Sequence, residues 1–263
     1  MKLVDLTRLL DPSDIERLPP ERRAGATPLF PLVKHIEPKH DGARVMSQIF
    51  GCTPEDLPDG EGWGDEQVRM STHLGTHVDA PLHYGSTCEG KPARTISDID
   101  LTELYQPAVV LDLRGKCEGG KGISLAALEA ALAENGAAIE PGSAILLRTG
   151  QERFGLADRE FFNYPGMTRE GTLYLSGLGA KVLGTDALGW DRPFGVMAKV
   201  FKETGDRSQI WDGHFAGRER EVFIVQQLAN LAELPPSGFH VGFFPMRLKA
   251  CSAAPARVVA FLP

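Results

Sequence analysis

The stretch STHLGTHVDAPLHYG, residues 71–85, holds the densest group of chemically active side chains in this sequence. It places three of the seven histidines and one aspartate within eleven residues: His73, His77, Asp79 and His83. Imidazole nitrogens and a carboxylate are the ligands that zinc, manganese and iron(II) prefer. Four such groups together seldom serve only to cap turns or to fill a core, so the stretch predicts a metal site.

The backbone has to bend for these side chains to share one ion. The spacing of His73 and His77 would place them on one face of a helix, but Gly75 and Pro81 disfavour a regular helix here. In a fully extended strand the two histidines would lie about 13 Å apart, which is too far for shared ligation. Glycine takes a positive φ angle readily, so we predict an extended segment that turns near Gly75.

Composition and charge narrow the class of protein. The 263 residues are 42% hydrophobic and 24% charged, which is typical of a globular protein, and we predict one domain over residues 1–263. A net charge of -7 argues against a nucleic-acid partner. The sequence has no long apolar run and its first residues are charged, which predicts a cytoplasmic protein without a membrane partner.

Hydrophobic patterning predicts a mixed α/β fold. Strands are expected within residues 3–7, 107–115, 143–150, 181–186, 239–248 and 256–263. A helix is expected between Ser124 as N-cap and Gly136 just past its end, and a shorter one ends near Gly179. A longer helix is expected from about Arg218 to Leu228.

Residues 11–65 differ from the rest because they are rich in proline, glycine and charge. A turn-rich segment of this length is unusual as a plain connection, so we interpret it as a lid, a substrate-facing loop or a dimer contact. Disorder is the alternative, although the segment contains Phe30, Phe50 and Trp63.

Residues 73–83 read H-x-G-T-H-x-D-x-P-x-H, and this pattern resembles the signature of the cyclase-like metal-dependent hydrolases. The segments VDLT, VVLDLRG, PGSAILLRTG, GTDALGWDRPF, WDGHFAGRERE and AAPARVVAF are similar to the longer, isatin-hydrolase-type branch of the family. The resemblance implies a swivelling β/β/α fold with a barrel-like mixed sheet. It also implies a homodimer or a larger homo-oligomer.

The resemblance also implies roles for individual residues. His73, His77 and Asp79 inherit the role of metal ligands, and His83 inherits that of general acid/base. His214 matches a later histidine that holds a second zinc in the kynurenine formamidases of the family. The alternative for His214 is that it does not bind the metal itself but contacts the metal ligands or binds the substrate.

Gln226 departs from the family pattern, since glutamate is expected twelve residues after that histidine. A neutral amide does not offset the repulsion between two divalent ions. We therefore expect one divalent metal ion, with Gln226 as a carbonyl ligand or as a hydrogen-bond donor. The resemblance to the isatin-hydrolase-type branch implies Mn²⁺ before Zn²⁺.

A divalent ion with open positions activates water and polarises a carbonyl, and a histidine can move the protons. The resemblance, together with Gln226, makes hydrolysis of the lactam ring of isatin to isatinate the leading hypothesis. The alternatives are arylformamidase action on N-formylkynurenine, hydrolysis of another cyclic amide, imide or lactone, and a non-catalytic binding protein. No G-x-S-x-G motif supports a serine hydrolase.

A small aromatic cyclic amide would need aromatic residues in the walls of its pocket. The candidates for this role are Phe30, Trp63, Trp190, Phe194 and Trp211.

Overall fold

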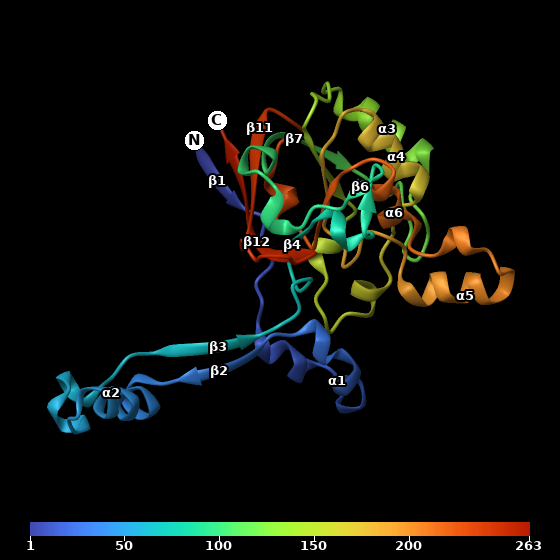
Figure 1. Cartoon of the computed structure of the whole chain (residues 1–263). Coiled ribbons are helices and arrows are strands. Elements are labelled where there is room, and N and C mark those ends of the chain that lie inside the picture. The colour runs from blue at the N-terminus through green and yellow to red at the C-terminus, as the bar shows by residue number, and fades with distance from the viewer. The chain divides into compact units, whose positions relative to one another are not determined.

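A computed structural model describes residues 1–263, with the exception of the side chain of Arg22. The chain divides into two compact units (Figure 1). The larger unit combines Met1–Leu9 with Thr72–Pro263, and the smaller unit is Leu10–Ser71. All the predicted metal ligands belong to the larger unit.

A mixed β-sheet forms the centre of the larger unit, and it closes into a barrel. The strand order is β1-β12-β11-β7-β8-β9-β10-β4, and β4 also pairs with β12, which closes a ring of seven strands with β1 added at the side. Strands β7 to β10 are parallel to one another, and the remaining pairings are antiparallel. The barrel-like mixed sheet implied by the resemblance is thereby confirmed.

The strands of this sheet are β1 (Lys2–Asp5), β4 (His77–Asp79), β7 (Tyr105–Asp112), β8 (Ala144–Arg148), β9 (Val182–Thr185), β10 (Phe223–Gln226), β11 (Phe239–Pro245) and β12 (Ala253–Leu262). Strands β5 (Thr87–Cys88) and β6 (Lys91–Pro92) form a separate short hairpin. The helices of the larger unit are α3 (Leu125–Asn135), α4 (Arg169–Gly177), α5 (Phe194–Thr204) and α6 (Asp212–Phe215).

Helix α3 begins and ends where the sequence predicts. The Ser124 side chain accepts a hydrogen bond from the Ala127 amide at the N-terminus of the helix. Gly136 ends it with a φ of 69°, a left-handed conformation that glycine adopts without steric cost. The predicted strands at 107–115, 143–150 and 181–186 are also confirmed, as β7, β8 and β9.

Two apolar clusters lie on opposite faces of the barrel wall. One fills the barrel interior and includes Val78 of β4 and Val225 of β10. The other lies between the strands and the helices, and it includes Ile224 of β10 and Leu128 of α3. Because side chains alternate along a strand, the neighbours of Val78 and Val225 point outward, away from the barrel interior.

The helix predicted from Arg218 to Leu228 is wrong, because this segment contains strand β10. All four residues of β10 are buried, and its backbone pairs with β9 on one side and with β4 on the other. A short apolar run of this kind fits either a buried helix or a central strand by its pattern alone. Its pairing with distant strands decides the outcome.

The smaller unit contains regular structure instead of turns alone. Its helices are α1 (Pro20–Ala26) and α2 (Ala43–Phe50), and strands β2 (Leu32–Ile36) and β3 (Asp65–Arg69) form an antiparallel pair. The assignment of this segment as a lid, a substrate-facing loop or a dimer contact stays a prediction.

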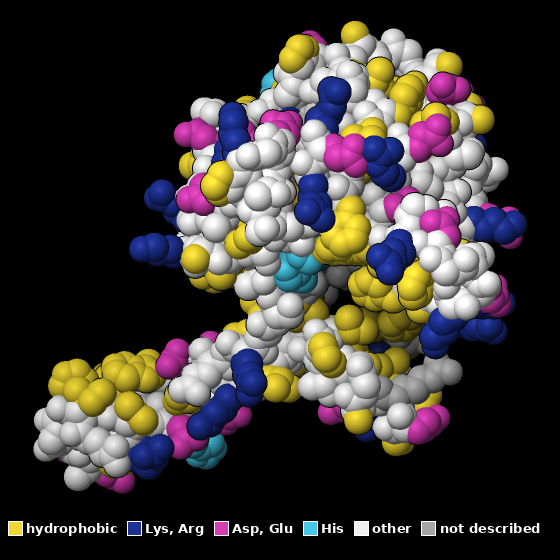
Figure 2. Space-filling model, turned by 45° about the vertical axis from the view of Figure 1, so that its right-hand side comes forward, with side chains coloured by type: hydrophobic (Ala, Val, Ile, Leu, Met, Phe, Trp, Pro, Cys, Tyr) yellow, Lys and Arg dark blue, Asp and Glu magenta, His cyan; other side chains and the backbone are white. Residues whose placement is uncertain are grey.

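Charged side chains of both signs are interspersed over the visible surface of each unit (Figure 2). Among the described residues, no helix combines the length and the apolar character needed to cross a bilayer.

Candidate metal and catalytic site

Strand β4 places His77 and Asp79 on the outward face of the barrel wall. Both side chains are buried, and the Nε2 atom of His77 lies 3.4 Å from Oδ1 of Asp79. Gly75, two residues before the strand, has a φ of 64°. The predicted turn at Gly75 is therefore present, and it returns the chain so that Nδ1 of His73 lies 2.8 Å from the same Asp79 oxygen.

The ring orientation of His77 is set by its own turn. Nδ1 of His77 lies 2.8 Å from the carbonyl oxygen of Gly75. A carbonyl can only accept a hydrogen bond, so Nδ1 donates to it and Nε2 is the ring nitrogen left to face Asp79. This is the arrangement of a metal-ligating histidine whose second nitrogen donates to a backbone carbonyl.

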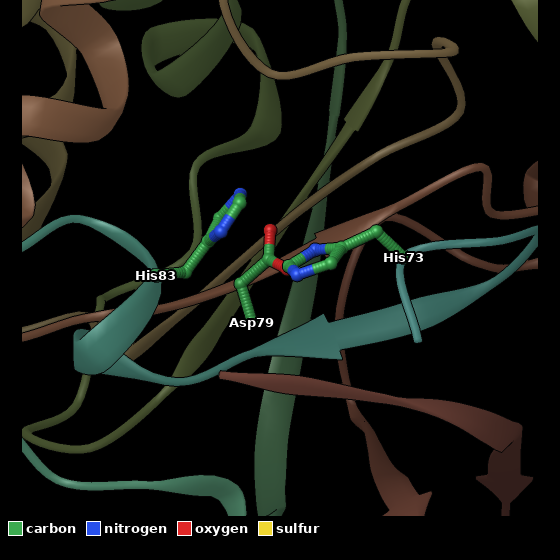
Figure 3. Close-up of side chains that lie close together, drawn as sticks. All are labelled: His73, Asp79 and His83. Carbon is green, nitrogen blue, oxygen red and sulfur yellow. The ribbon is translucent and has the colours of Figure 1, made fainter. Parts of the chain in front are cut away.

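His83 reaches the same point from a short helical turn, Pro81–His83, that follows β4. One potential ligand atom each from His73, Asp79 and His83 lies within 4.8 Å of the others (Figure 3). The His73 and His83 rings are 3.9 Å apart between centroids. Burial, with the positive charge of neighbouring histidines, lowers the pKa of His83 to about 4 despite the opposing charge of Asp79.

The donor atoms of this cluster fit a divalent cation. Asp79 is fully buried, and Asp79 Oδ1 and His77 Nε2 are buried atoms that make no hydrogen bond. Burial raises the pKa of Asp79, but the neighbouring His77, His214 and His73 outweigh it and hold the pKa well below its usual range. A buried carboxylate facing imidazole nitrogens is a donor set suited to zinc or manganese.

Gln226 and His214 contact the other oxygen of the Asp79 carboxylate. Nε2 of Gln226 donates to Asp79 Oδ2 at 2.8 Å and lies 3.3 Å from His214 Nε2. His214 Nε2 is 3.6 Å from Asp79 Oδ2. Gln226 stands directly across from His77 in the β10–β4 pairing, so sheet register places it in the site.

Asp191 is a residue of this site that sequence reasoning missed. It is buried, and its carboxylate accepts hydrogen bonds from the ring Nδ1 and the backbone amide of His214. Burial lowers the pKa of His214, but Asp191 and Asp79 outweigh it and raise that pKa to about 9. The only sequence signal was an aspartate beside a tryptophan in GTDALGWDRPF, which by itself does not indicate contact with a histidine 23 residues later.

Trp211 is the aromatic candidate that the structure brings to the cluster. Its ring stacks on that of His214, with centroids 4.4 Å apart, and meets His83 edge-on at 4.9 Å. Trp211 adopts a φ of 52°, a left-handed conformation that is rare for a bulky residue. The site therefore has an aromatic wall beside His83.

The other aromatic candidates have different surroundings. Trp190 is 1% exposed in the apolar cluster under the helices, and its indole donates to Thr172. Phe194 is 73% exposed at the start of α5. Phe30 and Trp63 belong to the smaller unit, where Phe30 is buried and Trp63 is 42% exposed. A role for these four in substrate binding stays a prediction.

Comparison with known proteins identifies the family. Residues 4–192 match a family model described as putative cyclase, and the chain therefore belongs to this cyclase family.

Two curated relatives are 25% and 23% identical to this chain. An isatin hydrolase of Roseibium aggregatum is 25% identical over 278 residues, covering 100% of this chain and 92% of that protein. A kynurenine formamidase of Sphingopyxis alaskensis is 23% identical over 190 residues, covering 71% of this chain and 75% of that protein. A crystal structure of an isatin hydrolase bound to the product analogue thioisatinate superimposes with a TM-score of 0.72 at 22% identity, covering 100% of this chain and 92% of that one.

Proposed function

We propose that this protein is a metal-dependent hydrolase that opens a small cyclic amide, with isatin as the first candidate and isatinate as the product. The observation that carries the proposal is the convergence of His73, His77 and His83 on the buried carboxylate of Asp79. Buried donor atoms without hydrogen bonds at this point favour a cation as their partner.

His73, His77 and Asp79 are the residues that would hold the metal, with His214 or Gln226 able to add a further donor. When bound, a divalent ion supplies Lewis acidity, which polarises a carbonyl and acidifies water. We favour one ion over two, because Asp79 is the only carboxylate among these five side chains and Gln226 is neutral. Mn²⁺ is the first candidate and Zn²⁺ the second.

His83 is proposed to move the protons. With its pKa lowered to about 4, the ring is neutral near pH 7 and can accept a proton from the attacking water. The same nitrogen can return that proton to the leaving nitrogen when the amide C–N bond breaks. Asp79 holds a fixed negative charge beside these steps, because its pKa lies well below its usual range.

A planar aromatic amide fits the surroundings of His83. The Trp211 ring lies beside both His83 and His214, and an aromatic wall of this kind favours stacking with a flat substrate. The full-length similarity to an isatin hydrolase supports isatin as the first substrate to test. The second candidate is N-formylkynurenine, which the partial similarity to a kynurenine formamidase favours.

The test is a metal analysis of the purified protein followed by parallel assays on isatin and N-formylkynurenine. Each assay is run with Mn²⁺, with Zn²⁺ and after chelation. We expect one ion per chain and turnover of isatin that chelation abolishes. Turnover of formylkynurenine alone would replace isatin as the substrate, and two tightly bound zinc ions per chain would refute the single-metal proposal.

A further inference from the structure

The Asp191 carboxylate is built into the structure around His214. Both residues are 3% exposed. Oδ1 of Asp191 accepts from the Gly213 amide, Oδ2 lies 3.2 Å from the His214 amide nitrogen, and Oδ2 also pairs with His214 Nδ1. The Asp191 carboxylate thus binds both the backbone of the first turn of α6 and the imidazole ring of His214 in that turn.

Close backbone approach makes these contacts feasible. A Cβ atom on Gly213 would lie 3.0 Å from Asp191 Oδ1, and one on Gly166 would lie 2.2 Å from the Asp191 carbonyl carbon. The next residue, Met167, pairs with Asp191 in a β-bridge. Glycines at these two positions let the segments on either side of Asp191 come near enough to fix its position.

The direction of the ring hydrogen bond determines what His214 presents to the rest of the site. The Asp191 carboxylate accepts from Nδ1, so Nδ1 carries a proton. When the ring carries its single proton on Nδ1, Nε2 has a lone pair that can bind a cation. This nitrogen lies 3.3 Å from Gln226 Nε2 and 3.6 Å from Asp79 Oδ2.

We propose that Asp191 is a positioning residue that holds the His214 ring with Nδ1 protonated, so that Nε2 faces Asp79 and Gln226 as an additional donor for the ion. This inference rests on the proposed metal site, and it concerns a residue that does not itself contact that site's ligand atoms. A merely structural role for Asp191, as the cap of α6, is the competing interpretation.

Asp191→Asn separates the two roles. Asparagine caps a helix about as well as aspartate, so the first turn of α6 is retained. Its amide nitrogen, however, can only donate, and facing His214 Nδ1 it would reverse the ring hydrogen bond and place the proton on Nε2. Asp212→Asn is the matched control, since Asp212 is a partly buried acid at the start of α6 that pairs with Arg192 instead of His214.

The first measurement is ¹⁵N NMR of the histidine ring nitrogens in the metal-free protein. We expect a proton on His214 Nδ1 in the wild type and in Asp212→Asn, and its loss in Asp191→Asn. An unprotonated Nδ1 in the wild type would overturn the proposal, and this result needs no variant that folds. It also stands whether or not the protein hydrolyses isatin.

The second measurement is the affinity for Mn²⁺ and Zn²⁺ of Asp191→Asn, His214→Ala and the double variant. We expect a loss of about 10- to 100-fold for Asp191→Asn, as for other residues that orient a ligand, and an unchanged affinity for Asp212→Asn. If Asp191 acts through His214, the double variant binds no more weakly than His214→Ala. Additive losses, or an unchanged affinity in Asp191→Asn, would overturn the positioning role, whereas a wild type that binds neither ion would refute the proposed function.

Discussion

At the scale of single residues, Asp79 concentrates the negative charge of the site. Oδ1 faces His73 and His77, and Oδ2 faces Gln226 and His214. Each oxygen of the Asp79 carboxylate thus has its own pair of neighbouring side chains. The two testable roles that follow are ligation by Asp79 and proton transfer by His83.

Asp79→Ala is expected to abolish binding of the metal, because it removes the carboxylate on which His73, His77 and His214 converge. Isothermal titration with Mn²⁺ and Zn²⁺ measures this loss directly. Asp112→Ala serves as the control, since Asp112 is a half-exposed acid paired with Arg114 and is not part of this cluster. Retention of full affinity in Asp79→Ala would move the metal site elsewhere.

His83→Ala is expected to retain the metal and substrate binding but to lower kcat by about 10²- to 10⁴-fold, the usual contribution of a positioned acid/base group. Steady-state kinetics and metal content are measured on the same preparation. His83 also lies within ligation distance of Asp79 and His73, so the metal content is informative in itself. Loss of the ion would make His83 a ligand, and unchanged turnover would exclude its role in proton transfer.

At the scale of elements, the turn at Gly75 sets the approach of His73 and the ring of His77. Its carbonyl accepts from His77 Nδ1, and its φ of 64° lies in the left-handed region. The strand that follows is only three residues long, so the turn contributes much of the geometry.

Gly75→Ala is expected to cost about 1–2 kcal/mol of unfolding free energy, because an alanine is strained in the left-handed region. It should also weaken metal binding by displacing His77. Gly136→Ala provides a matched control, since Gly136 has a φ of 69° at the end of α3 and an added Cβ there would meet only open space. Urea unfolding should show a similar loss of stability in both variants. Metal titration should show weaker binding in Gly75→Ala only, and equal metal affinities in the two variants would contradict the role of the turn.

Local chemistry explains which elements the sequence could predict. The Gly75 turn and the caps of α3 depend on φ preferences and on side chains a few residues away, and both predictions are confirmed. Strand β10 was predicted as a helix because its identity depends on pairing with β9 and β4. Asp191 was missed for the same reason, because only the folded chain brings it next to its partner, His214.

At the scale of the whole molecule, an ion-pair network ties the loop after β6 to the barrel. Arg94 pairs with both Glu103 and Glu221, and Lys181 also pairs with Glu221. Burial raises the pKa of Glu221, but hydrogen bonds from Arg94 and Lys181 outweigh it and hold the pKa below its usual value. The network therefore joins segments that are far apart in the sequence, since Arg94 and Glu221 are separated by 127 positions.

Glu221→Gln is expected to lower the unfolding free energy at pH 7 by about 1.5–3 kcal/mol, the range for hydrogen bonds to charged groups. Because the folded pKa lies below the unfolded one, the stabilisation is present above the unfolded pKa and is lost as the pH falls through the folded value. Urea unfolding at pH 7 and near pH 4 should show the difference from wild type shrinking on acidification. Glu219→Gln removes an exposed pair with Arg169 and should have little effect at either pH; an equal loss in both variants would contradict the role of burial.

The barrel closure has a thermodynamic consequence for the metal. Strand β4 is the seam of the ring, since it pairs with β10 on one edge and β12 on the other, and it carries two of the proposed ligands. An ion bound to β4 would stabilise the closed barrel, and with it the native state, by about 2.7 kcal/mol at a free ion concentration of 100 times its Kd. Chelation should therefore lower Tm and speed amide hydrogen exchange most at Val78 and its partners on either side. Exchange that is unchanged by the ion would show that β4 stays paired without it. The expected result would mean that the supply of metal affects the lifetime of the folded protein.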